Sequence, residues 1–157
     1  MSILKVDTIN EKTSGNGVQI PGHVVQVVQG STNTAMTSAS TSYADTGLTA
    51  AITPTSTSSK ILVRIAQHYR FDRYGFSIKI MRGSTNVHAP VNSYQVFNSD
   101  SNTNQRSYLN YEVLDSPSST SALTYKTQVI LNQSSGTNLQ INGNDFFSFM
   151  TLMEIAQ

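Results

Sequence analysis

A stretch near the middle of the chain alternates between two kinds of side chain over its whole length. In the stretch 60–71, apolar or aromatic residues recur at nearly every second position, and mostly basic or small residues lie between them. Side chains of a β-strand point alternately to opposite faces, so this period predicts a strand with one core-facing side. The predicted core-facing residues are Ile61, Val63, Ile65, Tyr69 and Phe71. After a polar turn at 72–75, Phe76, Ile78 and Ile80 resume the alternation, which predicts a hairpin.

The rest of the chain shows the same period and no helical one. Ser, Thr, Asn and Gln account for 63 of the 157 residues, and this composition favours strands and turns over helices. The stretch 83–107 is predicted to contain long surface loops. Further alternating stretches lie at 109–113, 125–131, 139–141 and 147–155, and 24–28 is a Val-rich strand. The sequence therefore predicts an all-β antiparallel sandwich, most simply a jelly roll.

A Pro-Gly pair divides the chain into an arm and a body. Pro21 lacks an amide hydrogen and Gly22 tolerates positive φ, so the pair ends one β-ladder and redirects the backbone. We expect an N-terminal β-arm at 1–22 and a jelly-roll domain at 23–157. A small hairpin is marginal alone, so the arm is expected to dock on another protein. Its anchoring residues are predicted to be Leu4, Val6, Ile9, Val18, Ile20 and Pro21.

Charge and cysteine content exclude several classes of partner and site. Charged residues make up only 12% of the chain and the formal net charge is +1, which argues against nucleic-acid binding or a membrane-surface role. The chain has no cysteine, so it has neither a disulfide framework nor a thiolate metal site. The sequence predicts no membrane insertion and no secretory signal, hence synthesis in a cytoplasm.

Two strands carry apolar residues on both faces. The strand at 24–28 and the last strand show this pattern, although a sandwich offers each strand one core face. Identical subunits would cover the second face. Alternatively, the Ser/Thr-rich segments or the arm of the same chain would fold back as a lid. The residues predicted at a subunit interface are Val24, Val27, Met150 and Leu152.

Basic residues concentrate in one window. Six of the ten basic residues lie in 60–82. This window predicts a cationic patch for an acidic glycan, a lipopolysaccharide phosphate or an acidic partner, and the alternative is a solvated face or subunit ion pairs. The predicted ligand or receptor patch consists of Arg64, His68, Arg70, Arg73 and Tyr74.

No catalytic constellation is evident, so we expect a protein that is not an enzyme. Four aspartates fall in predicted turns, where they usually cap backbone amides, although two suitably spaced carboxylates would allow glycoside hydrolysis. The three histidines are far apart in sequence. No metal site and no cofactor are predicted, while an axial trimer could still gather three copies of one histidine.

Several phrases resemble phage virion proteins. The stretches 4–9 and 17–22 resemble the opening of short virion proteins of tailed bacteriophages. The stretches 54–63, 114–117 and 152–155 are similar to the trimeric jelly rolls of the complement and tumour-necrosis-factor type that phages carry on their surfaces. This resemblance implies a homotrimer on the virion surface that is joined to other virion proteins, of the tail or capsid, through its arm.

The resemblance leaves the role on the particle open. The first expectation is a tail-fibre or knob protein that adheres to a host-surface glycan through loops around 71–75, 84–106 and 132–138. The second is a capsid decoration or cement protein that stabilises the head, and the third is a small glycan-cleaving enzyme. The chain has no long repetitive shaft, which favours a compact knob, adaptor or decoration over a complete fibre.

Overall fold

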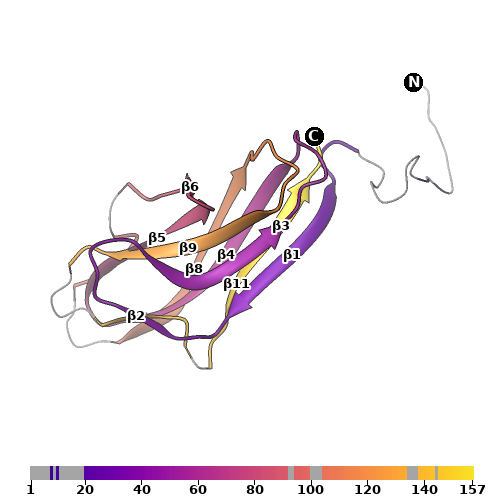
Figure 1. Ribbon diagram of the computed structural model, residues 1–157. Coiled ribbons are helices and arrows are strands. Elements are labelled where there is room, and N and C mark those ends of the chain that lie inside the picture. The colour runs from indigo at the N-terminus through magenta and orange to yellow at the C-terminus, as the bar shows by residue number, and fades with distance from the viewer. Residues whose placement is uncertain are drawn as a thin grey trace, which may run out of the picture.

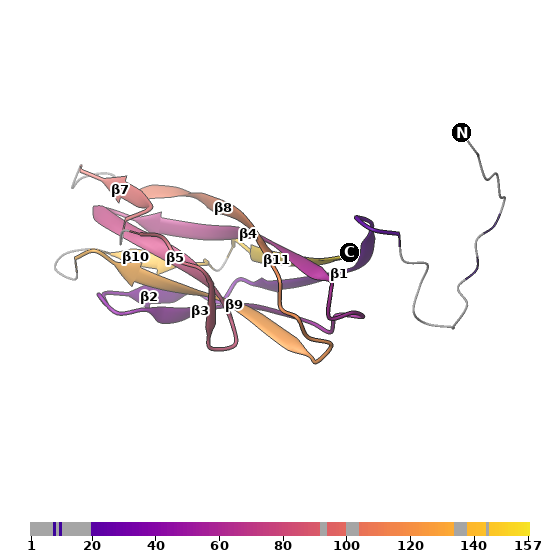
Figure 2. The same ribbon diagram turned by 90° about the horizontal axis from the view of Figure 1, so that it is seen from above.

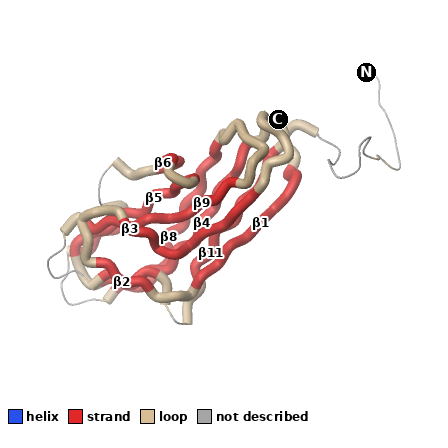
Figure 3. The backbone as a smooth tube through the Cα atoms, viewed as in Figure 1, coloured by secondary structure: helices blue, strands red, loops and turns tan. Residues whose placement is uncertain are grey.

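The chain forms a β-sandwich of two antiparallel sheets, which confirms the predicted fold class (Figure 1). The computed structural model describes residues 8, 10, 20–91, 94–99, 104–133, 138–143 and 145–157. Figure 3 shows these residues as strands joined by loops. The strands are β1 (Val24–Thr32), β2 (Met36–Ser38), β3 (Ala44–Ile52), β4 (Lys60–Phe71), β5 (Tyr74–Arg82), β6 (Thr85–His88), β7 (Val96–Asn98), β8 (Gln105–Asp115), β9 (Leu123–Leu131), β10 (Leu139–Ile141) and β11 (Ser148–Ile155).

The strand order is that of a jelly roll. Sheet A has the order β1-β11-β4-β8, and β10 and β2 continue it beside the far end of β4. Sheet B has the order β3-β9-β5-β6, and β7 pairs with the start of β5. Figure 2 shows the sandwich from above. Consecutive long strands cross repeatedly from one sheet to the other, as they do in a double Greek key.

The predicted hairpin of β4 and β5 is wrong. β4 pairs with β8, β10 and β11, whereas β5 pairs with β6, β7 and β9 in the other sheet. The turn at 72–73 therefore carries the chain across the sandwich. A hairpin within one sheet and two strands in opposite sheets give the same alternation, because alternation shows only which side of a strand faces the core.

The core contains the residues that alternation selects. Ile61, Val63, Ile65, Tyr69 and Phe71 are buried, which confirms the predicted inner face of β4. Phe76, Ile78 and Ile80 are buried opposite them on β5. The rings of Tyr69, Phe71 and Phe76 contact one another edge to face with centroids 4.9–5.7 Å apart. This geometry is favourable for aromatic pairs beyond the area that they bury.

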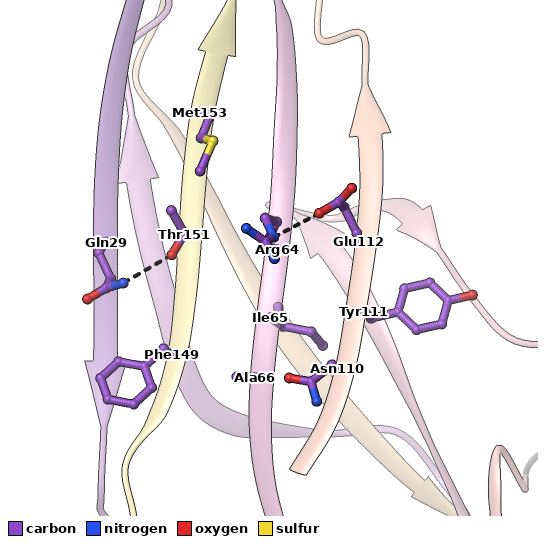
Figure 4. A pocket seen from close by; sticks show the side chains of 10 residues that line it. All are labelled: Gln29, Arg64, Ile65, Ala66, Asn110, Tyr111, Glu112, Phe149, Thr151 and Met153. Atoms are coloured by element: carbon purple, nitrogen blue, oxygen red, sulfur yellow. Dashed lines mark hydrogen bonds and ion pairs between the residues drawn. The ribbon is translucent and has the colours of Figure 1, made fainter. Parts of the chain in front are cut away.

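The predicted faces of β11 are reversed. Met150 and Leu152 are fully buried between the sheets, so they are core residues and do not form a subunit interface. The alternate residues Phe149, Thr151 and Met153 point to the outside of sheet A (Figure 4). The sequence could not settle this choice, because both faces of the strand carry apolar residues.

Both ends of the described body meet at one end of the sandwich. The Gly22 amide donates to the carbonyl of Ala156 over 2.8 Å, and the Ala156 amide donates to His23 over 3.0 Å. Gly22 has a φ of 87°, as a left-handed turn after Pro21 requires. The arm residues Leu4, Val6, Ile9 and Val18 lie outside the described residues, while Ile20 is exposed.

The stretch 83–107 is less irregular than predicted. β6, β7 and the first residues of β8 lie within it. Three strands therefore interrupt the predicted loops, and the expected adhesive range 84–106 is not one continuous loop. Among the described residues, no helix is long and apolar enough to span a bilayer.

A polar cluster lies inside the core, where alternation predicts an apolar residue. Gln67 is fully buried between Ile65 and Tyr69 on the inner face of β4. Its oxygen accepts a hydrogen bond from Thr127 over 2.8 Å, and its amide donates to Asn142 and Ser148 over 2.7 and 2.9 Å. A polar network in which the members are paired can fix one arrangement of strands. This cluster ties β4 to β9 and to the segment before β11.

Candidate subunit interface and distal pocket

The outer face of sheet A is unusually apolar for an exposed surface. Its exposed large hydrophobic side chains are Val27, Tyr108, Leu114, Phe147 and Phe149. They come from β1, β8, β11 and the residue before β11, so they extend across neighbouring strands. Leu62, Met153 and Ile155 lie among them with intermediate exposure. Contiguous apolar patches of this kind usually mark interaction surfaces.

The outer face of sheet B is different. Its strands β3, β5 and β9 carry no exposed large hydrophobic residue within the described part of the chain. Asp45 there accepts hydrogen bonds from Lys126 and Gln128 over 2.8 and 2.6 Å. The exposed aromatic pair of this sheet, Tyr94 and Phe97, lies at one end over Gly75. The two outer faces therefore differ in chemistry, and sheet A carries the candidate interface.

A depression lies in the middle of the outer face of sheet A. It has a volume of about 450 Å³, and Ala66 on β4 contributes to its lining. Figure 4 shows Phe149 and Met153 on one side and Asn110 and Glu112 on the other. Arg64 pairs with Glu112 over 2.8 Å across the depression, and both side chains are more than half exposed. The depression could receive a side chain from another subunit without burying an unpaired charge.

His68 lies on the outer side of sheet A, yet it is almost fully buried. Phe146 stacks on its ring at a centroid distance of 4.5 Å, and Tyr108 contacts it edge-on at 5.3 Å. Neither ring nitrogen has a hydrogen-bond partner among the described residues. Burial lowers the pKa of His68 below its usual value; the nearby backbone of Asn142 opposes this effect, and the positive charge of Arg106 adds to it. The ring therefore packs beneath the two aromatic side chains.

The residues of the predicted cationic patch are dispersed. Arg64 lies near the middle of β4, and Arg70 is six residues further along the same face, about 20 Å away. Arg73 and Tyr74 lie on the turn into sheet B, with the Arg73 guanidinium 5.3 Å from the centre of the Tyr74 ring. His68 is covered as described above. Arg64 therefore does not form one patch with Arg70 and Arg73, which lie at the end of β4 and in the turn after it.

Several polar contacts converge at that end, which we call the distal end because it lies away from the C-terminus (Figure 1). Asp72 accepts hydrogen bonds from the backbone amide and the side-chain amide of Asn138 over 2.9 and 2.5 Å. Its own carbonyl accepts from Asn98 over 2.9 Å. Asn132 pairs with Gly75 in both directions. These contacts join the predicted loop regions 71–75 and 132–138 within the described residues.

A recess of about 750 Å³ opens at the distal end. Its lining consists of Thr37, Ser38, Ala39, Arg70, Asp72, Asn104, Asn138, Leu139 and Gln140. These residues come from β2, β4, β10 and the loops beside them. Of the predicted patch, Arg70 alone lines this recess. The described residues include no cluster of three or more metal-ligating side chains.

Sequence reasoning missed most residues of the apolar face. Phe149 was expected on the inner side of β11, and Leu114 and Tyr108 were not singled out. Both belong to β8, where inward Leu109, Tyr111 and Val113 alternate with outward residues. The available signal was the presence of large apolar residues at outward positions of this predicted strand. A second signal was the run of aromatic residues at 146–149.

No protein-family model matches the chain, and no curated protein is significantly similar to it in sequence.

Proposed function

We propose that this protein is a non-enzymatic structural protein of a bacteriophage virion, assembled as a homotrimer through the outer face of sheet A. The apolar character of that face carries the proposal. A single chain that exposed it would leave Val27, Leu114 and Phe149 in water, whereas a second and third copy would bury them. The jelly-roll strand order agrees with the phage-surface family that the sequence resembles.

Identical copies fit this face better than a highly charged partner. The ion pair of Arg64 and Glu112 balances charge within the depression, and the other lining side chains are uncharged. Interfaces between identical subunits are typically more apolar than other protein surfaces. The occupant of the outer face of sheet A is therefore proposed to be a second copy of this chain.

The positions of the two ends of the sandwich support attachment through the arm. Gly22 pairs with Ala156 at the end where the chain terminates, and the turn at 72–73 lies at the opposite end (Figure 1). An arm that bound another virion protein would leave the distal end facing outward. This arrangement suits an appendage of the tail-fibre or knob type that contacts the host surface.

The mass of the purified protein in solution tests the assembly. Light scattering is expected to give three times the 17.1 kDa of one chain. Phe149→Asp places a charge in the apolar face and is expected to yield monomers. Thr49→Asp, on the exposed outer side of β3, is the matched control and should leave the trimer intact. A monomeric parent protein would overturn the proposed interface.

Imaging of virions with the labelled protein tests the role. Label on the tail supports the appendage, label on the head supports capsid decoration in its place, and no label on the particle would overturn the virion assignment. Deletion of residues 1–21 should leave a folded trimer that fails to join the particle. Incubation with host polysaccharide should release no new reducing ends, because the protein is proposed not to be an enzyme.

A further inference from the structure

Two arginines face each other across neighbouring strands at the distal end. The register pairs Arg70 on β4 with Arg106 on β8, and it pairs Arg70 with Gln140 on β10. Thr37 on β2 pairs with Gln140, so four residues form one row across sheet A. Side chains at directly opposed positions have Cβ atoms roughly 5 Å apart, and like charges there repel. The row therefore places two positive charges side by side, and their repulsion does not stabilise the fold.

Neither arginine takes part in an ion pair with a described residue. Three ion pairs occur among the described residues, and each uses a different basic residue from Arg70 and Arg106. Arg70 instead donates from Nε to the neutral Asn104 side chain over 3.2 Å. That contact orients the guanidinium and uses only its Nε donor. A guanidinium has five N–H donors, and bidentate binding to an oxyanion uses two of them.

The carboxylate that lines the recess is already engaged. Burial raises the pKa of Asp72, but hydrogen bonds from Asn138 and from the backbone amides of Asp72 and Arg73 together outweigh that effect and hold the pKa below its usual value. The Asp72 carboxylate thus accepts hydrogen bonds that hold Asn138 in place. Each of its oxygens accepts a hydrogen bond from Asn138, and neither takes part in an ion pair with Arg70.

The recess beside the arginines is lined mainly by hydroxyl and amide groups. Thr37, Ser38, Asn104, Asn138 and Gln140 contribute them, and the volume of about 750 Å³ falls within the range of small-ligand sites. Such groups can pair with several hydroxyls of a sugar ring, whereas a largely apolar ligand would find few partners. The arginines therefore favour an anionic group on the ligand, and the recess favours hydroxyl groups on the same ligand.

We propose that the distal recess binds an anionic saccharide, whose carboxylate or phosphate lies on Arg70 and Arg106 and whose hydroxyls lie against Gln140 and its neighbours. The proposal rests on the adhesive role above. Arg70 and Arg106 share the outer face of sheet A with the proposed trimer interface, but the register places them beyond Tyr108, nearer the distal end, and all lining residues belong to one chain. The proposal also accounts for the opposed arginines, because a bound oxyanion would attract both guanidinium groups and offset the repulsion between them.

Calorimetric titration of the purified full-length protein tests this site. The probes are glucuronic acid, glucose 6-phosphate, glucose and inorganic phosphate. Binding of glucuronic acid identifies a carboxylate ligand, and binding of glucose 6-phosphate identifies a phosphate ligand. Glucose should bind at least about tenfold more weakly than the better of these two, because it cannot use the arginines. Inorganic phosphate should also bind more weakly, because it leaves the amide-lined recess empty.

Variants separate a built site from general charge. Arg70→Gln with Arg106→Gln should weaken binding by about tenfold or more. Arg70→Lys should also weaken it, because lysine keeps the charge but loses the planar fork. The control, Lys60→Gln with Lys126→Gln, removes two positive charges away from the recess and should change affinity less than about twofold.

Four results would overturn the proposal. They are no binding of either acidic sugar, equal binding of glucose, equal binding of inorganic phosphate, and equal losses in the arginine and lysine variants. Light scattering on the same samples reports the assembly separately. A trimer that binds no saccharide would thus reject the site and keep the proposed assembly, and a saccharide-binding monomer would do the reverse.

Discussion

Glu154 is a fully buried carboxylate that fastens the loop between β3 and β4 to the last strand. Its oxygens accept hydrogen bonds from the amide and the hydroxyl of Thr55 over 2.8 and 2.7 Å, and from the Gln26 side chain over 2.6 Å. Burial raises the pKa of Glu154, but the hydrogen bonds from Gln26, Ser59 and Thr55 more than offset that effect and leave the pKa lowered. The ionised form is therefore the one that the fold stabilises.

Glu154→Gln keeps the shape of the side chain and replaces one acceptor oxygen with a donor. At least one hydrogen bond to a charged group is lost, and two donors then face each other in a buried site. A hydrogen bond of this kind contributes roughly 1.5–3 kcal/mol, so we expect a loss of about 2 kcal/mol at pH 7. For a chain of this length the loss corresponds to a fall in the thermal midpoint of about 4–8 °C.

The loss should depend on pH in a defined direction. A carboxyl whose folded pKa is depressed stabilises the fold above its unfolded pKa, here the ordinary value of 4.5, and this contribution disappears as the pH falls through the folded pKa. Glutamine does not titrate. The difference in unfolding free energy between the parent and Glu154→Gln should therefore be full above about pH 5 and shrink in more acidic solution.

Urea unfolding at pH 7 and at pH 3, at one protein concentration, measures both effects. Asp45→Asn is the control, because Asp45 forms its ion pair with Lys126 on the exposed side of sheet B. That variant should cost less than about 1 kcal/mol. The reasoning is refuted if Glu154→Gln matches the parent protein at pH 7, or if its deficit is undiminished at pH 3.

Two further substitutions probe the interior. Gln67→Leu removes three buried hydrogen bonds, to Thr127, Asn142 and Ser148, so urea unfolding should show a loss of about 3 kcal/mol, and no loss would mean that these bonds add nothing to stability. Gly30→Ala would place Cβ 1.9 Å from the carbonyl oxygen of Thr49, and it should cost about 3 kcal/mol or prevent folding because β1 and β3 must separate. Gly143→Ala, whose nearest contact would be an ordinary 3.5 Å, should change the thermal midpoint little. Equal effects of the two glycine substitutions would contradict the close approach of β1 and β3.

Sequence alone predicts the class of fold and the inner face of the strongest strand. In β4, a period of two places Ile61, Val63 and Phe71 on one side, and the structure buries all three. The prediction succeeds because alternation is a local property that neighbouring residues specify together. It also predicts the turn at Pro21 and Gly22, since both residues act on their own backbone.

The candidate sites could be predicted only in part. Arg70 was identified within a run of basic residues, whereas Arg106 lies 36 positions later and nothing local links the two. The apolar outer face of sheet A was expected in kind, because β11 has apolar residues on both sides. Its members were assigned wrongly, because the residues that become core depend on where sheet B lies.

The sequence by itself determined where most of the long strands lie, because side-chain period and turn residues act within a few positions of the chain, but it did not predict β6 and β7. The tertiary structure alone decided which strands pair, why β4 and β5 separate into different sheets, and which face of β11 is buried. It also brought Arg70 opposite Arg106 and buried Gln67 among partners from distant segments. The physical reason is that pairing and burial are properties of surfaces that distant segments build together, and the period of any one strand is the same for several such arrangements.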